Sequence, residues 1–348
     1  MNPQAEEIHG GVDYQEFREL GLHPKDVIDF SSNIMPFGPS PEVVRSLHEL
    51  VIDRYPDRDG YELRSALAQY HGMSVSQIML GNGCSQLIHL TAMCWIKPGM
   101  NVIVLGPTFS EYARASKIAG GVCTEVSVFN SMSDSPTDAF LEHIQSHSPD
   151  VVWLCNPNNP TGHYLDAGEL GNLIEAMPQI KFIVDESYLD FVLNGASLFC
   201  RYFPNLIVLR SMTKYYAMAG LRLGYLSCTE STMKQLMERR VPWSVNGAAL
   251  VAGTAALNSL TYYRDSMEKL RQANKSLTQA LKRIGLQPKD SSVPFFLVPV
   301  DNGKRTREQL LKKRILVRDC RSFGLENMIR ISTQTDTLNE QLLLALRT

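Results

Sequence analysis

Uninterrupted apolar runs alternate with amphipathic stretches through the middle of the chain. Continuous, β-branched runs are typical of parallel strands covered on both faces, whereas apolar residues at three- and four-residue spacing indicate helices. The predicted strands and helices are residues 101–106, 151–155, 181–185 and 206–210, and residues 109–119, 139–146 and 167–177. Strands and helices that alternate in this way predict an α/β fold with right-handed crossovers.

The pattern changes after Pro242, where a long helical stretch runs from about residue 246 to 284. The elements predicted after it are a strand, a helix, two short strands and a final helix, at 294–298, 306–313, 315–318, 328–332 and from 337 onward. This succession favours a smaller α+β domain. We therefore expect an irregular N-terminal segment (1–40) that crosses to the small domain and the active site, a large domain (41–245) and a small C-terminal domain (246–348).

Composition narrows the class of protein. With 348 residues, of which 44% are hydrophobic and 20% charged, the chain is expected to fold rather than to stay disordered. The net charge of -2 gives no reason to expect nucleic acid or a membrane as a partner. The seven cysteines are odd in number and lack CxxC spacing, which favours a reduced, cytoplasmic protein. The N-terminus is polar, unlike a signal peptide, and no apolar run reaches membrane-spanning length.

Ligand-binding residues are expected in the loops that follow strands, because ligands of open α/β sheets bind beyond the carboxyl ends of the strands. In "MLGNGCSQLIHL" (79–90), a Gly-Asn-Gly precedes a helix. Backbone N–H groups at such a helix start could hold a phosphate at Gly83, Cys84 and Ser85. Taken alone, a plain glycine turn capped by Ser85 is the better interpretation.

Two further loops carry polar side chains at strand ends. "CNPNNPTGH" (155–163) is stiffened by two prolines, so Asn159 would project from a rigid loop; an Asx turn without a ligand is the alternative. "IVDESYLDF" (183–191) ends its strand on Asp185, which is costly to bury unless it is paired. A metal, a protonated ring nitrogen or an arginine could be its partner, and Tyr188 could reach the same ligand. No metal is expected, because histidines and carboxylates nearby lack ligand spacing.

Lys214 lies just past a buried strand in "SMTKYYAMAGLRLGY". A lysine there would lose its proton easily, as an imine-forming amine must. Ser211, Thr213 and Arg222 offer two hydroxyls and a guanidinium for a phosphate; a solvated lysine and a salt-bridged arginine are the alternative. Together, the four loops supply the parts that pyridoxal phosphate (PLP) needs.

The segments "NPNNPTG", "VDESY" and "SMTKYYAMAGLRLGY", in this order, resemble the fold-type I PLP enzymes of the aspartate aminotransferase superfamily, and the resemblance covers essentially the whole chain. It implies a large PLP-binding domain with a mostly parallel seven-stranded sheet between helices, plus the small α+β domain. It also implies that Lys214 forms the Schiff base and shuttles the proton, while Asp185 binds the pyridinium nitrogen. Asn159 and Tyr188 would bind the ring's phenolic oxygen, and Phe109 would stack on the ring.

For the cofactor phosphate, the resemblance implies Cys84, Ser85, Ser211, Thr213 and Arg222. Tyr55, in "DRYPD", would reach the phosphate of the neighbouring subunit's cofactor, which implies a homodimer with shared active sites. For a small phosphorylated amino-acid substrate, it implies that Arg330, with Arg318 nearby, takes the carboxylate. His9, Ser32 and Asn33 are the candidates for the substrate phosphate.

Two subfamilies share these residues. "HGG" (9–11), "DFSSNIMPFG" (29–38), the Ser-x-Thr-Lys order and "VPWSVN" (241–246) resemble the threonine-phosphate decarboxylases. The main prediction is therefore decarboxylation of L-threonine O-3-phosphate to (R)-1-aminopropan-2-yl phosphate, a lyase step of cobalamin biosynthesis. The alternative is a histidinol-phosphate-type aminotransferase. Met35, Cys84 and Gln86 depart from the common pattern and leave the substrate open.

Two other classes of function are weaker alternatives. A non-catalytic ligand-binding or regulatory protein on the same fold is disfavoured because Lys214 is intact. A nicotinamide dehydrogenase is disfavoured because no GxGxxG follows the first strand.

Overall fold

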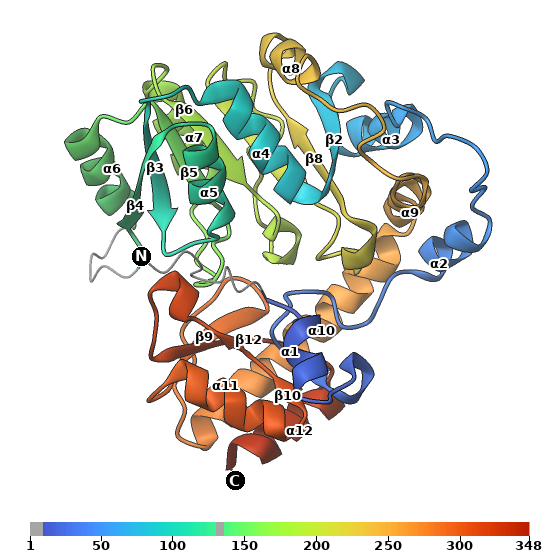
Figure 1. Ribbon diagram of the computed structural model, residues 1–348, viewed down its shortest axis with the longest axis vertical. Helices are drawn as coiled ribbons and strands as arrows, with labels where there is room; N and C mark the ends of the chain where they lie inside the picture. Colours follow the sequence, from blue (N-terminus) through green and yellow to red (C-terminus); the bar gives the residue numbers. More distant parts are fainter. Residues whose placement is uncertain (1–9, 130–135, 348) are drawn as a thin grey trace. The chain divides into compact units, whose positions relative to one another are not determined.

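The computed structural model describes residues 10–129 and 136–347 (Figure 1). The chain divides into two units by its internal contacts. The larger unit comprises Gly38–Asn159 and His163–Arg264. The smaller unit comprises the described residues up to Phe37, the short segment Pro160–Gly162 and the chain from Asp265 on. His9 lies outside the described residues.

The larger unit contains a seven-stranded sheet with the order β2-β8-β7-β6-β5-β3-β4. Its strands are β2 (Ile78–Asn82), β3 (Asn101–Gly106), β4 (Val122–Ser127), β5 (Val151–Cys155), β6 (Lys181–Asp185), β7 (Leu206–Ser211) and β8 (Leu223–Ser227). β8 runs antiparallel to both of its neighbours, β2 and β7, and the other strand pairs of this sheet are parallel. This arrangement confirms the predicted fold class, a mostly parallel seven-stranded sheet between helices.

The continuous apolar runs predicted four of these strands. The edge strand β4 shows why the pattern did not predict the others. Most of its side chains are exposed or half-buried, with Val126 as the buried exception. A strand that is covered on both faces is uniformly apolar, whereas an edge strand mixes polar and apolar residues. β4 therefore lacks the pattern by which β5 and β6 were predicted.

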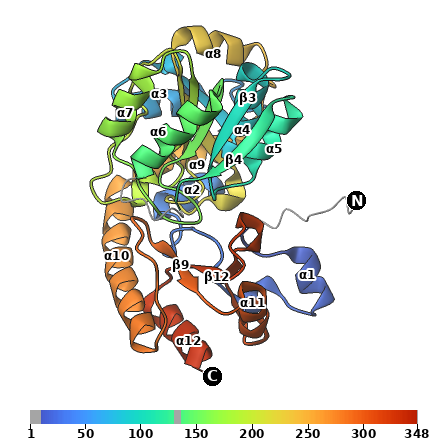
Figure 2. The same ribbon diagram turned by 90° about the vertical axis from the view of Figure 1, so that its left-hand side faces the viewer.

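The helices of the larger unit are α2 (Pro41–His48), α3 (Tyr61–His71), α4 (Gly83–Trp95), α5 (Glu111–Ile118), α6 (Pro136–His147), α7 (Ala167–Ala176), α8 (Glu230–Met237) and α9 (Gly247–Leu257). Helix starts follow the expected chemistry: the Asp166 carboxylate accepts from the first N–H groups of α7, at 2.8 Å from Gly168 N. Helices cover both faces of the sheet (Figure 2). Ile183 of β6 packs in the same cluster as α4, while its neighbour Phe182 meets Phe140 of α6 edge-on, because successive strand side chains point to opposite faces.

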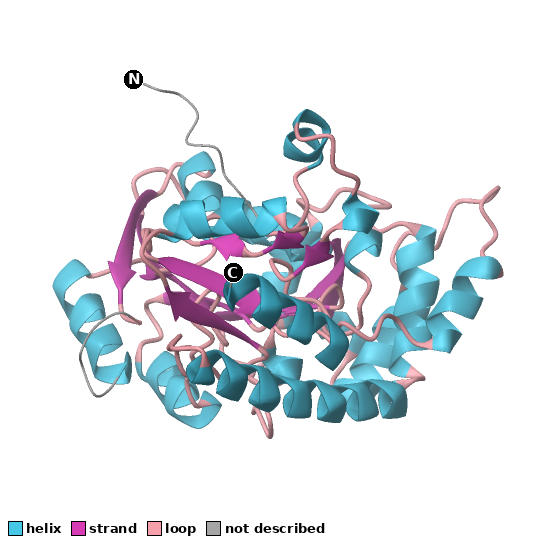
Figure 3. Cartoon of the chain, turned by 90° about the horizontal axis from the view of Figure 1, so that it is seen from below, coloured by secondary structure: helices cyan, strands magenta, loops and turns pink. Residues whose placement is uncertain are grey.

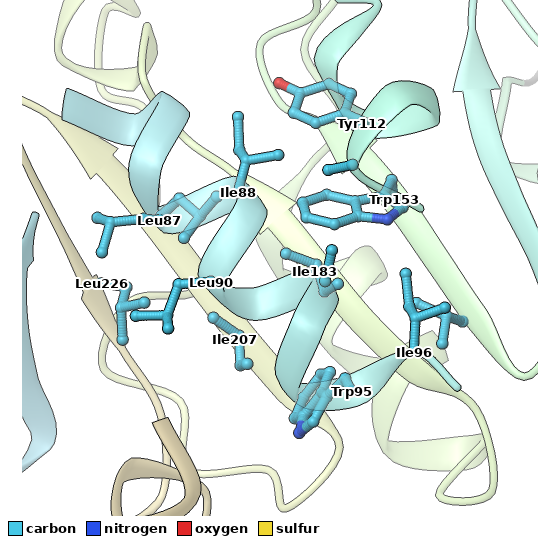
Figure 4. Close-up of a cluster of buried hydrophobic side chains, with 14 of the residues drawn as sticks. Leu87, Ile88, Leu90, Trp95, Ile96, Tyr112, Trp153, Ile183, Ile207 and Leu226 are labelled. Carbon is cyan, nitrogen blue, oxygen red and sulfur yellow. The ribbon is translucent and has the colours of Figure 1, made fainter. Parts of the chain in front are cut away.

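Helix α4 is held on the sheet by apolar packing. Figure 4 shows Leu87, Ile88 and Leu90 of α4 with Ile183, Ile207 and Leu226, which come from the neighbouring strands β6, β7 and β8. Each fully buried side chain of this kind stabilises the fold by about 1.5–3 kcal/mol relative to exposure. The packing fixes where the first turn of α4 lies against the sheet.

The smaller unit contains an antiparallel sheet of order β11-β12-β9 and a parallel pair of β1 with β10. Figure 3 colours the helices, strands and loops of the chain. Its elements are α1 (Tyr14–Glu19), β1 (Ile28–Asp29), the greater part of α10 (Leu260–Arg283), β9 (Phe295–Pro299), α11 (Gly303–Lys312), β10 (Ile315–Leu316), β11 (Arg318–Asp319), β12 (Met328–Ser332) and α12 (Asp336–Arg347). Short 3₁₀ turns lie at Pro24–Asp26, Val75–Gln77, Leu189–Phe191, Ala219–Leu221 and Arg321–Phe323 of the chain. The core of this unit includes Phe30, Phe296 and Ile329.

The long helix predicted over residues 246–284 is in fact two helices, α9 and α10. The break falls at Asn258 and Ser259. The Ser259 hydroxyl donates to the Ala255 carbonyl at 2.8 Å and also to Glu42 at 3.2 Å. No helix of the described residues is long and apolar enough to cross a bilayer.

Candidate active site

The carboxyl ends of β5, β6 and β7 bring the predicted loops of the larger unit to one edge of the sheet. Cys155 is paired with Asp185 across β5 and β6, and Asp185 is paired with Leu209 of β7. The start of α4 reaches the same edge, since the Cys84 thiol donates to the Arg210 carbonyl oxygen at 3.1 Å. Residues more than a hundred positions apart in the sequence thus surround one place.

Asp185 is a buried carboxylate with two neutral donors. The Tyr112 hydroxyl donates to Oδ2 at 2.8 Å, and the Ser187 backbone N–H donates to Oδ1 at 2.9 Å. Burial raises the pKa of Asp185, while these donors and the charge of Lys214 act to lower it. The structural Asp–Arg pair considered from the sequence is not what the structure shows, because the positive charge that lowers the pKa of Asp185 is that of Lys214. A positively charged ring nitrogen would complete the compensation.

Lys214 is half-buried and lies in a turn, three residues past β7. Its carbonyl oxygen accepts from the Ala217 N–H at 3.2 Å. Its charge is near enough to act on the pKa of Asp185. A lysine amine and a buried carboxylate therefore lie within electrostatic range of each other at the sheet edge.

The start of α4 forms a cradle that favours glycine. Gly83 has a φ of +70°, and a Cβ on it would lie 2.5 Å from the Nη2 atom of Arg222. A Cβ on Gly224 would lie 2.7 Å from the backbone nitrogen of Cys84. A guanidinium and helix-start N–H groups thus converge, which is the donor set that a phosphate prefers.

The hydroxyls of Ser211 and Thr213 are two further buried groups that could bind a phosphate. The oxygen atoms of Ser211 and Thr213 are 2.7 Å apart, and the Thr213 N–H donates to Ser211 at 3.2 Å. Ser85, in the first turn of α4, is half-buried. Both hydroxyls come from the end of β7 and the turn before Lys214, as the sequence predicts.

The departures at Cys84 and Gln86 have structural roles. The Cys84 thiol donates to Arg210 and accepts from the Ser187 hydroxyl at 3.3 Å, and burial raises its pKa to about 12, so it stays neutral. The Gln86 side-chain oxygen accepts from the Asn82 N–H at 2.7 Å and so stabilises the first turn of α4. Met35, the third departure, is buried in the smaller unit.

Asn159, Tyr188 and Phe109 lie in loops that follow strands of the sheet or precede its helices. Asn159 and Tyr188 are buried and Phe109 is half-buried. The loop of Asn159 is held by the side chain of Asn156, which exchanges hydrogen bonds with the Leu165 backbone at 2.8 and 2.9 Å.

Sequence reasoning missed Tyr112 and Ser187. Tyr112 stacks on Trp153 with centroids 5.2 Å apart and contacts Phe109 edge-on. Burial and the Asp185 charge raise the pKa of Tyr112 well above its ordinary value, so the phenol keeps its proton and donates. The available signals were a tyrosine three residues past Phe109 and a serine two past Asp185.

Arg318 and Arg330 are opposite each other in the antiparallel pair β11–β12 of the smaller unit, and both are buried. Arg330 donates to the Ser31 carbonyl and lies over the Phe295 ring, 5.6 Å from its centroid. Burial and the charge of Arg330 lower the pKa of Arg318 to about 10, which leaves Arg318 cationic at neutral pH. Two neighbouring buried cations form a site for an anion.

Ser32 and Asn33 differ in what they can offer a ligand. The Ser32 hydroxyl donates to the Asp29 carboxylate at 2.6 Å. Asn33 is only 4% exposed, and neither its amide nitrogen nor its oxygen has a hydrogen-bond partner among the described residues. A buried, unsatisfied amide is costly unless a ligand satisfies it.

Tyr55 lies elsewhere on the larger unit. It is 86% exposed, and its ring packs on Trp243 with centroids 5.4 Å apart. Within residues 10–129 and 136–347, no group of three or more His, Cys, Asp or Glu side chains is arranged to hold a metal ion.

The donor set of the larger unit fits PLP. The glycine cradle with Arg222 suits its phosphate, Asp185 suits its ring nitrogen, and Lys214 suits its aldehyde. The fit rests on the positive φ of Gly83 and on the buried Asp185 carboxylate, whose hydrogen-bond donors Tyr112 and Ser187 are both neutral.

Comparisons with known proteins agree with this fit. Residues 25–346 match the family model "Aminotransferase class I and II". The histidinol-phosphate aminotransferase of Moorella thermoacetica is 34% identical over 340 residues, covering 95% of this chain and 86% of that protein. Among solved structures, the histidinol-phosphate aminotransferase of Sinorhizobium meliloti in complex with pyridoxal-5'-phosphate has a TM-score of 0.86 at 22% identity, covering 100% of this chain and 97% of that one. The L-threonine-O-3-phosphate decarboxylase of Porphyromonas gingivalis has a TM-score of 0.81 at 26% identity, covering 91% and 97%.

The comparisons correct the main functional prediction. The curated relatives at 30–34% identity over 92–95% of the chain are histidinol-phosphate aminotransferases. The prediction of a threonine-phosphate decarboxylase is therefore wrong, and the aminotransferase alternative is better supported. The error has a simple cause, since both kinds of enzyme share the loops that hold the cofactor and the decarboxylase prediction depended on four short segments.

Proposed function

The chain belongs to the class I and II aminotransferases, a family of PLP enzymes, and we propose that it transfers the amino group of histidinol phosphate, or a closely similar phosphorylated amino compound, to a 2-oxo acid. The substrate assignment rests on one observation. The relatives that match nearly the whole chain are histidinol-phosphate aminotransferases. The residues at the sheet edge supply the chemistry.

When bound, PLP supplies an electron sink for the bond that breaks beside the substrate nitrogen. We propose that Lys214 carries the cofactor covalently and that its Nζ, once released, takes the proton from the substrate Cα as a general base. The Asp185 carboxylate would hold the proton on the ring nitrogen, and its geometry is kept by Tyr112 and Ser187. Asn159 and Tyr188 would orient the ring through its oxygen, and Phe109 would cover one face.

The cofactor phosphate would be bound by the cradle of Gly83, Cys84, Ser85 and Arg222, with the hydroxyls of Ser211 and Thr213. In this assignment Cys84 contributes its backbone N–H, because its thiol already donates to Arg210.

Arg318 and Arg330 are proposed to bind an anionic group of the substrates, either the phosphate of the amino donor or the carboxylate of the acceptor. Ser32 and Asn33 are the two candidates for the substrate phosphate among the described residues. The Asn33 side-chain amide is available as a donor, whereas the Ser32 hydroxyl already donates to Asp29. His9 stays a candidate from the sequence.

We further propose a homodimer in which Tyr55 reaches the cofactor phosphate of the neighbouring subunit. Large apolar side chains around Tyr55 and its neighbour Trp243 are exposed, and such patches mark protein interfaces. The patch, named here the Tyr55 patch, comprises Val51, Ile52, Tyr55, Val241 and Trp243. All seven cysteines carry free thiols, which suits a reducing compartment, and we propose a cytoplasmic enzyme.

The proposal is tested by incubating the purified, PLP-loaded protein with histidinol phosphate and a 2-oxo acid, and in parallel with L-threonine O-3-phosphate. We expect a new amino acid to form from the 2-oxo acid only in the first reaction, without carbon dioxide. Carbon dioxide released from threonine phosphate, with no amino transfer from histidinol phosphate, would overturn it.

A further inference from the structure

Arg210 is a buried arginine that the proposed chemistry does not use. It precedes Ser211 at the end of β7, and only 4% of it is exposed. Because successive strand residues face opposite sides, its side chain points away from the side that Ser211 occupies. Its two terminal nitrogens go to two different carboxylates.

The first carboxylate belongs to Glu186, the residue directly after Asp185. The Nη1 atom of Arg210 donates to Glu186 Oε2 at 3.2 Å, and the Leu198 N–H donates to Oε1 at 2.7 Å. Ser197 also donates to Glu186. Glu186 is therefore fully engaged, and the strand end that carries Asp185 is held from behind.

The second carboxylate belongs to Asp190, two residues after Tyr188. The Nη2 atom of Arg210 donates to Asp190 Oδ1. A third contact uses the Arg210 backbone, whose carbonyl oxygen accepts from the Cys84 thiol in the first turn of α4. One residue thus touches the segments of Asp185, Tyr188 and Cys84 and is bonded to Ser211.

The three charges depend on one another. Burial by itself would lower the pKa of Arg210, but Asp190 and Glu186 hold that pKa well above its ordinary value. Burial raises the pKa of Glu186, and Arg210 opposes the rise. Buried ion pairs contribute little net stability, but they can specify one geometry, because any shift of a partner leaves a charge uncompensated.

We propose that Arg210, through Glu186 and Asp190, is a positioning residue that sets the relative placement of the loops that contact PLP. The inference rests on the cofactor contacts of the proposed function. Arg210 itself touches none of the proposed contact atoms of PLP and acts through the backbone on either side of it.

The test compares Arg210→Lys with the wild type. Lysine keeps the charge but has one ammonium, which cannot bridge two carboxylates as the guanidinium fork does. We expect the dissociation constant of PLP from the refilled apoprotein to rise about tenfold, with a shifted absorption maximum of the bound cofactor. Arg239→Lys is the matched control, because Arg239 is half-exposed and pairs with the exposed Glu238; PLP affinity should not change there.

A purely structural role would lower the melting temperature of Arg210→Lys and leave PLP affinity within threefold of wild type, and that result overturns the inference. If Arg210→Lys does not fold, Asp190→Asn replaces it, because the Asp190 side chain is 16% exposed and the change is isosteric. A PLP dissociation constant within threefold of wild type would again overturn the inference. Wild-type protein that does not take up PLP on Lys214 would instead refute the proposed function, so the two failures are distinguishable.

Discussion

The role proposed for Asp185 comes at the expense of the stability of the cofactor-free protein. Burial raises its pKa above the ordinary 3.8. Between that value and the raised one, the folded apoprotein binds a proton that the unfolded chain does not. The free energy of unfolding therefore falls as the pH rises through this range, and a bound pyridinium would reverse the cost.

Asp185→Asn should separate these two effects. At pH 7.5 the variant apoprotein should be more stable than the wild type by on the order of 1 kcal/mol, because it buries no charge. At pH 4.5 the difference should shrink. Urea unfolding of both apoproteins at the two pH values measures this, and PLP titration should show weaker binding to the variant. An apoprotein that loses stability at pH 7.5 would contradict the argument.

Lys214→Ala should abolish the covalent attachment of PLP and slow amino transfer by about 10²–10⁴-fold, the usual contribution of a positioned base. Borohydride reduction followed by peptide mapping should find the cofactor on the wild-type peptide of Lys214 and not on the variant. The exposed Lys117, in α5, provides the control Lys117→Ala, which should keep both the label and the activity.

The first turn of α4 is the element in which backbone conformation matters most. It begins at a glycine with positive φ, is capped by Gln86 and touches Arg222, Gly224 and Arg210. Its packing on β6, β7 and β8 holds the donors in place before any ligand arrives (Figure 4). A preorganised N-terminus of this kind loses little entropy when it binds a phosphate.

Gly83→Ala should weaken PLP binding at least tenfold, because its Cβ would displace the Arg222 guanidinium. The protein should lose about 1–2 kcal/mol of stability from the left-handed backbone, since the guanidinium is the flexible end of its side chain and can move away. Gly72→Ala is the matched control, since Gly72 has a φ of +67° and nothing within 4 Å of its Cβ position. That variant should lose a similar free energy of unfolding, about 1–2 kcal/mol, and keep its PLP affinity. Equal PLP affinity in the two variants would refute the cradle.

For the whole molecule, the Tyr55 patch makes the proposed dimer testable. Ile52→Glu places a charge in the patch, and burying it unpaired at an interface costs about 3–5 kcal/mol. Size-exclusion chromatography with light scattering should show a dimer for the wild type and a monomer for the variant, with activity lost in parallel. Leu193→Glu, at a position that is also exposed (61%, against 86% for Ile52) but lies outside the patch, should remain dimeric. A wild-type protein that is monomeric and fully active would refute the proposal that two subunits share each active site.

The local sequence pattern was sufficient to predict the strands β3, β5, β6 and β7 and the motif loops at their ends. A covered parallel strand and a loop shaped by proline or glycine each depend on residues that are adjacent in the sequence. The cofactor followed from those loops. Long-range contacts were not predictable: Tyr112 meets Asp185 across 73 positions, and Arg222 meets Gly83. Such contacts depend on strand order and register, which no short window encodes. The resemblance to known enzymes, and no local pattern, placed Arg318 near Arg330, whereas their strand register and the ion pairs of Arg210 emerged only once the chain was folded.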